Sequence, residues 1–186
     1  TSAIYIRRQS VAAQQKAIIA DSLRRLEQSA LTSTSSSVDE ANIRVREAEL
    51  IQDFVRRAAT LEPDGVVVVS RGGTVKDNDV IVIPQKTDVV HVSGEVLIPK
   101  AITYEKGMSL HEYLESAGGL SDRADKDNIL VAKQNGEVGK VQNMGIAPGD
   151  RILVMPRFDS KNMQLAKDFT QILYQIAVAT KVAVGL

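Results

Sequence analysis

Two histidines and a group of aspartates are the residues whose types could support catalysis or metal binding. His91 and His111 lie far apart in the chain, and the sequence contains no cysteine, so the spacing of a zinc site does not occur. Asp122, Asp125 and Asp127 share one short segment, which lacks the central Gly and the final Glu of an EF-hand loop. We therefore expect the histidines to be structural or on the surface, the aspartates to form a solvated loop, and no metal to be bound.

The sequence also lacks the motifs of common catalytic and nucleotide-binding sites. No G-x-S-x-G, Walker A or G-x-G-x-x-G motif occurs. The chain carries 23 basic and 23 acidic residues, so it lacks the basic excess of a nucleic-acid binder, and aromatic residues make up only 4%. These features predict no enzymatic activity, no cofactor and no nucleic-acid partner, and leave binding, assembly or transport as functions.

Length and segment composition limit the number of domains and the kinds of targeting or membrane segment that the chain can contain. The 186 residues suffice for one ordinary domain or two small ones. The chain starts at Thr1 without the charged and apolar segments of a signal peptide, which predicts that it begins at an internal cut. No run of 18 apolar residues occurs, so we expect no ordinary transmembrane helix.

The first half of the sequence predicts a small module that a helical hairpin interrupts. A short strand at 3–6 precedes two segments with helical periodicity, which together form a hairpin over about 8–61, joined by a Ser/Thr-rich stretch at 32–37. Strands at 66–69 and 80–83 follow, and both are rich in Val and Ile. The hairpin either packs over a sheet or protrudes and contacts a neighbouring subunit.

An internal repeat relates this module to the second half. Residues 77–84 and 148–156 both read as a tight turn, an Asp, an apolar strand and a terminating Pro. Self-similarity at one long interval indicates two related modules. We therefore predict a first module at 1–86, a second at 87–157 and a separate C-terminal helix at 160–186.

The second module predicts a small sheet with one helix across it. Its strand at 89–96 is followed by a turn and a helix that begins at a capping box of Ser109 and Glu112. Gly118 and Gly119 mark the end of that helix. A strand at 129–132 and an Asn135-Gly136 turn predict a hairpin, and a last strand follows Pro148. The order is β-turn-β-α-β-β-β, which is an α+β fold.

This string of motifs resembles the SLBB (soluble ligand-binding β-grasp) domain over about 88–156. The segment 167–177 is similar to the C-terminal helix of bacterial outer-membrane capsule polysaccharide export proteins, the Wza-like group. The resemblance implies an α+β fold of β-grasp (SLBB) modules, the first of them interrupted by the hairpin and the second followed by an amphipathic helix. The chain would be the C-terminal part of such a protein, because the export domain and the lipidated Cys of the family are missing from it.

The resemblance also implies a function, a compartment and partners. The protein would be a subunit of a homo-oligomeric ring in the outer membrane, mostly periplasmic, that passes polysaccharide to the cell surface and receives it from an inner-membrane polysaccharide co-polymerase. Tyr104, Glu105, Lys106 and Asn135 are the candidate glycan contacts. The alternative is a monomeric periplasmic carbohydrate-binding β-grasp module without a channel role.

The C-terminal helix has two chemically different faces. As a helix, residues 163–186 would span about 36 Å, close to bilayer thickness. The helix could pack on the sheet, lie on a membrane surface, or join copies of itself in a barrel with polar groups towards the lumen. The candidate lumen-facing residues are Gln164, Lys167, Asp168, Gln171 and Gln175. The candidate lipid- or partner-facing residues are Leu165, Phe169, Ile172, Leu173 and Ile176.

Overall fold

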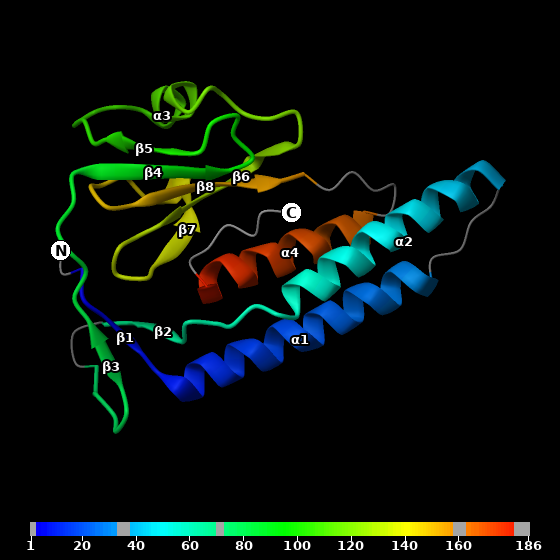
Figure 1. The fold of residues 1–186 in the computed structure, drawn as a ribbon, viewed down its shortest axis with the longest axis horizontal. Coiled ribbons are helices and arrows are strands. Elements are labelled where there is room, and N and C mark those ends of the chain that lie inside the picture. Colours follow the sequence, from blue (N-terminus) through cyan, green and yellow to red (C-terminus); the bar gives the residue numbers. More distant parts are fainter. Residues whose placement is uncertain (1–2, 33–37, 70–72, 158–162, 181–186) are drawn as a thin grey trace.

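A computed structural model describes residues 3–32, 38–69, 73–157 and 163–180 (Figure 1). Most of the Ser/Thr-rich joint and the end of the expected C-terminal helix therefore lie outside the described residues. The helices are α1 (Gln9–Thr32), α2 (Val38–Ala58), α3 (Leu110–Ser116) and α4 (Met163–Thr180), with a 3-10 turn at Val141–Asn143. The strands are β1 (Tyr5–Arg7), β2 (Val66–Val68), β3 (Val80–Val82), β4 (Val89–Gly94), β5 (Lys100–Thr103), β6 (Ala124–Ala132), β7 (Val138–Lys140) and β8 (Arg151–Pro156).

The second module is a five-stranded sheet in the order β5-β4-β8-β6-β7. Strand β4 pairs parallel with β8, and the other neighbouring pairs are antiparallel. The predicted β-β-α-β-β-β order is confirmed, and so is the α+β class. Strand β6 starts earlier than expected, at Ala124, with an irregularity between Ala124 and Ile129. Asp125 and Asp127 therefore lie at the irregular start of a strand and not in a loop as predicted.

One face of this sheet is covered by α3. The predicted capping box is present: Ser109 Oγ accepts from the Glu112 N–H, and the Glu112 carboxylate accepts from the Ser109 N–H. Gly118 and Gly119 both have positive φ and end the helix, as the sequence predicts. The helix places its buried side chains against β4, β6 and β8, in a core that contains Val90, Val92, Val96, Tyr113, Leu114, Ala117, Ala124, Ile129, Val131, Ile152 and Val154.

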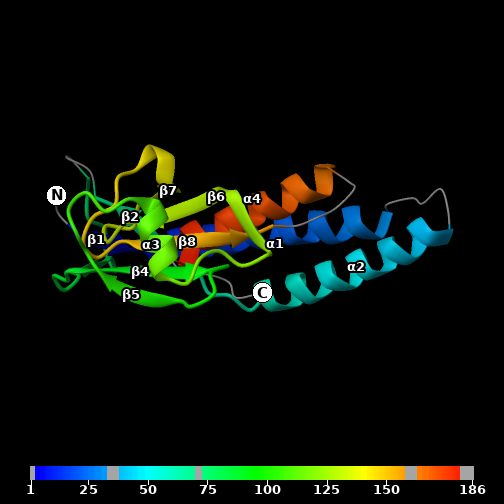
Figure 2. The ribbon, with the colours of Figure 1, turned by 90° about the horizontal axis from the view of Figure 1, so that it is seen from above.

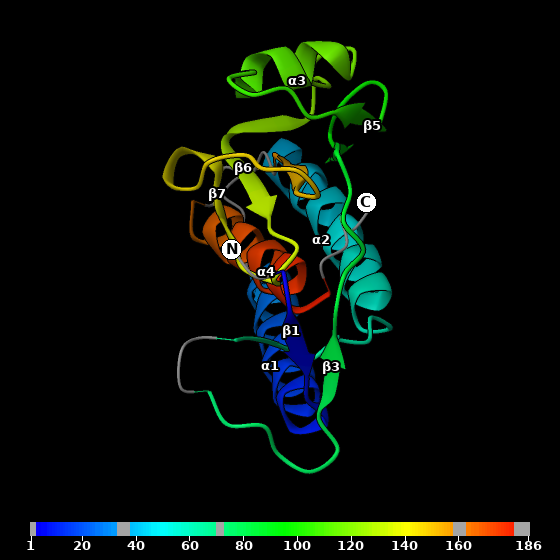
Figure 3. The same cartoon turned by 90° about the vertical axis from the view of Figure 1, so that its left-hand side faces the viewer.

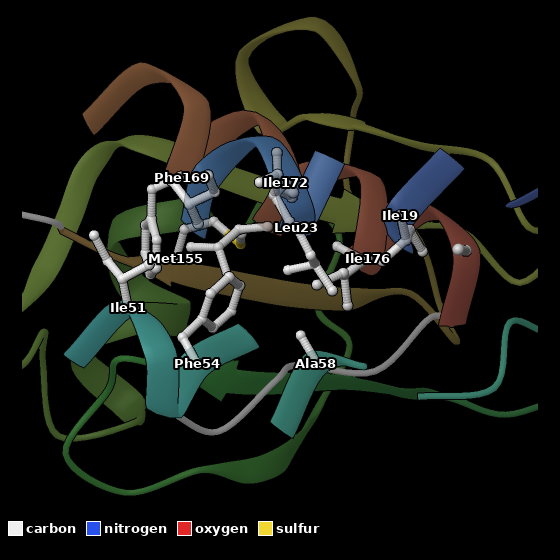
Figure 4. Close-up of a cluster of buried hydrophobic side chains, with 14 of the residues drawn as sticks. Ile19, Leu23, Ile51, Phe54, Ala58, Met155, Phe169, Ile172 and Ile176 are labelled. Atoms are coloured by element: carbon white, nitrogen blue, oxygen red, sulfur yellow. The ribbon is translucent and has the colours of Figure 1, made fainter. Parts of the chain in front are cut away.

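The opposite face of the sheet is covered by α1, α2 and α4 (Figures 1 and 3). Leu153 and Met155 of β8 and Leu130 of β6 point into this second core, where all three helices meet (Figure 4). The rings of Phe54 on α2 and Phe169 on α4 lie 4.6 Å apart between centroids, at 52° to each other. The helices contribute Ile19, Leu23, Leu26, Ile51, Phe54, Ala58, Leu165, Phe169, Ile172, Leu173, Ile176, Ala177 and Ala179.

The helical hairpin is packed at its base and projects at its far end. Ile19, Leu23 and Phe54 near the base are buried. The ends of α1 and α2 towards the connecting segment extend beyond α4 and the sheet (Figures 1 and 2). There Leu31 is 60% exposed and Val45 is 58% exposed. The hairpin therefore covers a sheet at its base and protrudes at its far end, and contact of that end with a neighbouring subunit stays a prediction.

A second, smaller sheet lies at the start of the hairpin, in the order β2-β1-β3. Its central strand β1 precedes α1, and its two outer strands follow α2, as the sequence predicts for the interrupted module. Both outer strands pair antiparallel with β1.

The internal repeat is also a repeat of structure. The Asp79 carboxylate accepts the Lys76 N–H at 2.8 Å, and the Asp150 carboxylate accepts the Ala147 N–H at 2.7 Å. Asn78 and Gly149, the residues before these aspartates, both have positive φ, which is the conformation that a type II turn requires at its third residue. Each turn thus closes on a buried Asp that starts an apolar strand.

Removing the Phe169 ring should destabilise the chain strongly. Phe169→Ala leaves a cavity where three helices meet, so we expect a loss of about 3–5 kcal/mol in the free energy of unfolding. Leu50→Ala on α2 is the control, because Leu50 is 64% exposed, and a surface change of this kind should alter stability by ~0.5 kcal/mol or less. Urea unfolding followed by circular dichroism measures both. Equal losses in the two variants would show that α4 does not pack as described.

The Arg8–Asp79 pair should make stability fall at acid pH. A hydrogen bond from Arg8, helped by the Lys76 N–H, lowers the pKa of Asp79 from 3.8 to about 2. A lowered carboxyl pKa gives stability that is complete above 3.8 and disappears as pH falls towards 2. Urea midpoints of the wild type and Asp79→Asn should therefore differ by a constant amount at neutral pH and converge over that window. Asp77→Asn, at an exposed residue of the same turn, is the control, and a difference that persists at pH 2 would contradict the pairing.

Candidate functional site

The residues expected to touch glycan do not come together in the structure. Tyr104 follows β5 at one edge of the five-stranded sheet, and Asn135 lies in the β6–β7 turn at the other edge. Four strand spacings separate these edges, about 19 Å. Lys106 is exposed, whereas Tyr104 is half-buried against the core under α3. The four predicted contacts therefore do not form one compact site in the structure, and their contact with glycan stays a prediction.

Asn135 has a structural role in its own turn. Its side-chain oxygen accepts the Glu137 N–H at 3.0 Å, which holds the β6–β7 hairpin. It also lines a hollow of about 190 Å³ beside the ion pair of Lys133 and Asp150. That pair is largely buried, with an Nζ–Oδ2 distance of 2.6 Å. The carboxylate of Asp150 is thus engaged by Lys133 and by the Ala147 N–H.

A larger hollow of about 450 Å³ lies at the C-terminal end of α3. Its lining combines apolar side chains with charged and hydroxyl groups. The lining residues are His111, Leu114, Glu115, Gly119, Leu120, Ser121, Asp122, Ala124, Lys126 and Arg157. Sugars have apolar C–H faces and many hydroxyl groups, so a lining of mixed apolar and polar groups suits a carbohydrate.

The largely buried carboxylate of Glu95 holds Ser121, which lines this hollow, in place. Glu95 Oε2 accepts the Ser121 hydroxyl at 2.6 Å, and Glu95 Oε1 pairs with Arg123 at 3.3 Å. The Glu95 side chain is only 13% exposed. Arg157 enters from the end of β8, where its N–H donates to the Arg123 carbonyl at 2.6 Å. The hollow is therefore held by contacts between segments far apart in the sequence.

A second hollow of about 360 Å³ adjoins the first and shares Asp122 and Arg157 with it. Its other lining residues come from α2, β8, α4 and the loops between strands: Glu47, Leu50, Phe54, Arg57, Glu95, Arg123, Pro156 and Phe169. We refer to these two neighbouring hollows together as the track; the first is lined by residues of α3 and the second by residues of α2. Sequence patterns could not reveal it, because the packing of the hairpin against the SLBB-like sheet brings these residues together.

The residues expected to face lipid or a partner on α4 lie inside the chain. Leu165, Phe169, Ile172, Leu173 and Ile176 are all 5% exposed or less, and they contact α1, α2 and the sheet. They therefore lie in the core of the described chain, and their assignment to lipid or a partner stays a prediction. Among the residues that the structure describes, no helix is long and apolar enough to cross a membrane.

The residues expected to line a lumen form the outer side of α4. Gln164, Lys167 and Gln171 are exposed, and Asp168 and Gln175 are half-buried. Gln164 donates to Asp168 at 2.7 Å. Within the described part of the chain, the Gln175 Oε1 atom is buried without a hydrogen-bond partner. The assignment of these residues to a lumen stays a prediction.

Neither histidine and none of the aspartates forms a metal site in the described residues. His91 is exposed on β4, and His111 pairs with Glu115 at 3.3 Å on the surface of α3. Asp125 accepts the Asp127 N–H at 3.0 Å and the Asn128 side-chain amide at 2.6 Å. This aspartate therefore shapes the irregular start of β6.

Comparison with known proteins agrees with the resemblance drawn from the sequence. Residues 89–146 match the SLBB domain family. Two Escherichia coli proteins, both named polysialic acid transport protein KpsD, are 40% identical to the chain over 190 residues. The alignments cover 100% of this chain and 34% of each relative, so the chain spans about a third of their length. Residues 89–146 are therefore an SLBB domain, and the whole chain is related to about a third of the length of proteins named for polysialic acid transport.

Proposed function

We propose that the chain is part of a subunit of an outer-membrane polysaccharide translocon. The protein would export capsular or exopolysaccharide from the periplasm to the cell surface through a homo-oligomeric ring, with an inner-membrane polysaccharide co-polymerase as its supplier. The observation that carries the proposal is the 40% identity, along the whole chain, to proteins named for polysialic acid transport. The relatives are named as transport proteins, which supports a role without catalysis.

Exposed apolar side chains support self-association. Leu97 and Ile98, in the loop between β4 and β5, are 64% and 57% exposed. They lie on the SLBB domain, away from the free end of the helical hairpin, where Leu31 and Val45 are also exposed. Neighbouring large apolar groups on a surface commonly mark a contact with another protein. Two such places on one chain suit a ring, in which each subunit contacts two neighbours through different surfaces.

The proposed attachment of α4 to the outer membrane requires a rearrangement. The apolar face of α4 is the same face that fills the core against α1 and α2. Exposing this face to lipid would remove Phe169 and its neighbours from that core. The polar outer side of α4, with Lys167 and Gln171, is free to face a lumen or a neighbour without any rearrangement.

The proposed contact of the SLBB domain with glycan is the track at the end of α3. Lys126 and Arg157 can donate to hydroxyl or carboxylate groups of a sugar, and Asp122 can accept from hydroxyls. The track continues across α2, so it suits a run of sugar units better than a single one.

The ring can be tested through the Leu97–Ile98 pair. We expect the full-length protein to form a multimer by light scattering in detergent, and the double variant Leu97→Glu, Ile98→Glu to dissociate while keeping its circular dichroism spectrum. The variant should also fail to restore export in a strain that lacks the protein. Ile18→Glu, at an exposed position on α1, is the control. A stable wild-type monomer would contradict the ring and favour a monomeric carbohydrate-binding module.

Glycan binding can be tested by reversing single lysine charges. We expect Lys126→Glu to weaken binding of a short oligosialic acid by about tenfold or more, because a charge-assisted hydrogen bond becomes a repulsion. Lys100→Glu, on β5, is the control, and a neutral maltooligosaccharide measures how much of the affinity depends on carboxylates. If Lys106→Glu weakens binding and Lys126→Glu does not, the contact lies where the sequence predicts it and not in the track.

A further inference from the structure

The small sheet has the same arrangement as half of the SLBB domain. Its order β2-β1-β3 corresponds to β7-β6-β8, with antiparallel pairing throughout. The register corresponds as well. Arg7 of β1 lies opposite Val66 and Val80, just as Ala132 of β6 lies opposite Val138 and Arg151.

The ion pairs that anchor the two units also correspond. Arg8, directly after β1, binds Asp79 at 2.7 Å, and Lys133, directly after β6, binds Asp150 at 2.6 Å. The side chains of Asp79 and Asp150 are 1% and 3% exposed, and these residues directly precede β3 and β8. The match of strand order, register and buried ion pair makes β1, β2 and β3 the counterparts of β6, β7 and β8.

This correspondence identifies a face of the small sheet that lacks its cover. In the SLBB domain Ile129, Val131, Ile152 and Val154 are buried beneath α3. Their counterparts are Ile4, Ile6, Ile81 and Ile83, all of them isoleucines. Ile6, on the central strand, is only 5% exposed, but the three isoleucines around it are open: Ile4 is 37% exposed, Ile81 is 55% exposed and Ile83 is 74% exposed. In the described chain, no helix lies over this face as α3 lies over the other (Figures 1 and 3).

The outer edge of β3 corresponds to an edge that is paired in the SLBB domain. There β4 pairs parallel with β8, and His91 and Glu95 donate their N–H groups to the carbonyls of Asp150 and Val154, each at 3.0 Å. The corresponding carbonyls are those of Asp79 and Ile83. No strand among the described residues pairs with this edge of β3. An apolar edge strand left open in this way is prone to pair with another segment.

We propose that the small sheet is the second half of another β-grasp domain, completed by a β-β-α segment of the longer protein. Its first strand would pair parallel with β3, and its helix would cover the exposed side chains of Ile4, Ile81 and Ile83. The helical hairpin α1–α2 would then be an insertion between β1 and β2, at the place where the SLBB domain has only residues 133–137 between β6 and β7.

The order of strands and helix along the SLBB domain indicates where in the sequence this segment lies. There β4, β5 and α3 all precede β6, so their counterparts precede β1 and belong on the amino-terminal side of Tyr5. The relatives have room for such a segment, because the alignment covers only 34% of their length. The same chain therefore supplies the cover, and no second subunit is needed at this face.

Two neighbouring residues of β3 allow a matched test. Ile81 and Val80 are 55% and 57% exposed, and they point to opposite faces of the strand. Ile81 is the counterpart of buried Ile152, whereas Val80 is the counterpart of Arg151, where a charge is already accommodated. Ile81→Glu and Val80→Glu are each made in residues 1–186 and in the protein extended by its natural amino-terminal sequence. Thermal midpoints and amide hydrogen exchange at 79–83 are measured in all of them.

We expect Ile81→Glu to lower the midpoint strongly in the extended protein and hardly at all in residues 1–186. Val80→Glu should have a small effect in both. Wild-type amides of Ile81 and Ile83 should exchange far more slowly in the extended protein. Equal effects of the two variants at both lengths, or equal exchange at both lengths, would overturn the proposal. Slow exchange of the 79–83 amides in residues 1–186 that appears only at high protein concentration would also overturn the proposal. It would show that a second copy of the chain, and not an amino-terminal segment, covers the small sheet.

Discussion

The strand β8 is buried on both of its faces, and most of the architecture follows from that constraint. Ile152 and Val154 point towards α3, and Leu153 and Met155 point towards α1, α2 and α4. A strand with apolar residues on both faces needs a layer on each side. The single helix inside the SLBB domain can supply only one of these layers. The second layer must come from the helical hairpin and from α4, which lie outside the domain in sequence but share its core.

This shared core changes what α4 can contribute. A helix with an apolar and a polar face suits a membrane or a barrel when its sequence is considered alone. Its apolar face instead closes the core of the SLBB sheet, and the Tyr174 hydroxyl donates to the Val138 carbonyl at 3.2 Å on β7. The surface of the described chain therefore includes the polar side of α4 and the track beside α3, whereas the apolar side of α4 is enclosed.

Local sequence patterns predict most of the helices and strands, whereas the candidate site depends on contacts between residues far apart in the sequence. The capping box at Ser109 and the repeated Asp turns are set by neighbours in sequence, so their residues reveal them. The start of β6 at Ala124 is missed, because polar residues at 125–128 hide a strand that pairs only through its ends. The track is missed because its residues are far apart in the sequence: Arg157 lines one hollow with Lys126 and the other with Leu50. Asn135 is predicted as a glycan contact, and the structure adds that its side chain holds its own turn, a role that the sequence alone does not separate from ligand binding.

The docking of α4 in the chain's own core is the central claim, and native-state hydrogen exchange tests it most directly. Leu165 to Ile176 and β8 share one core, so their amides should exchange through the same global opening, with the same free energy and the same dependence on denaturant. Exchange of α4 amides close to the rate of an unstructured peptide, while β8 remains protected, would contradict the claim. It would show that α4 is detached from the core and free to reach a membrane or a lumen.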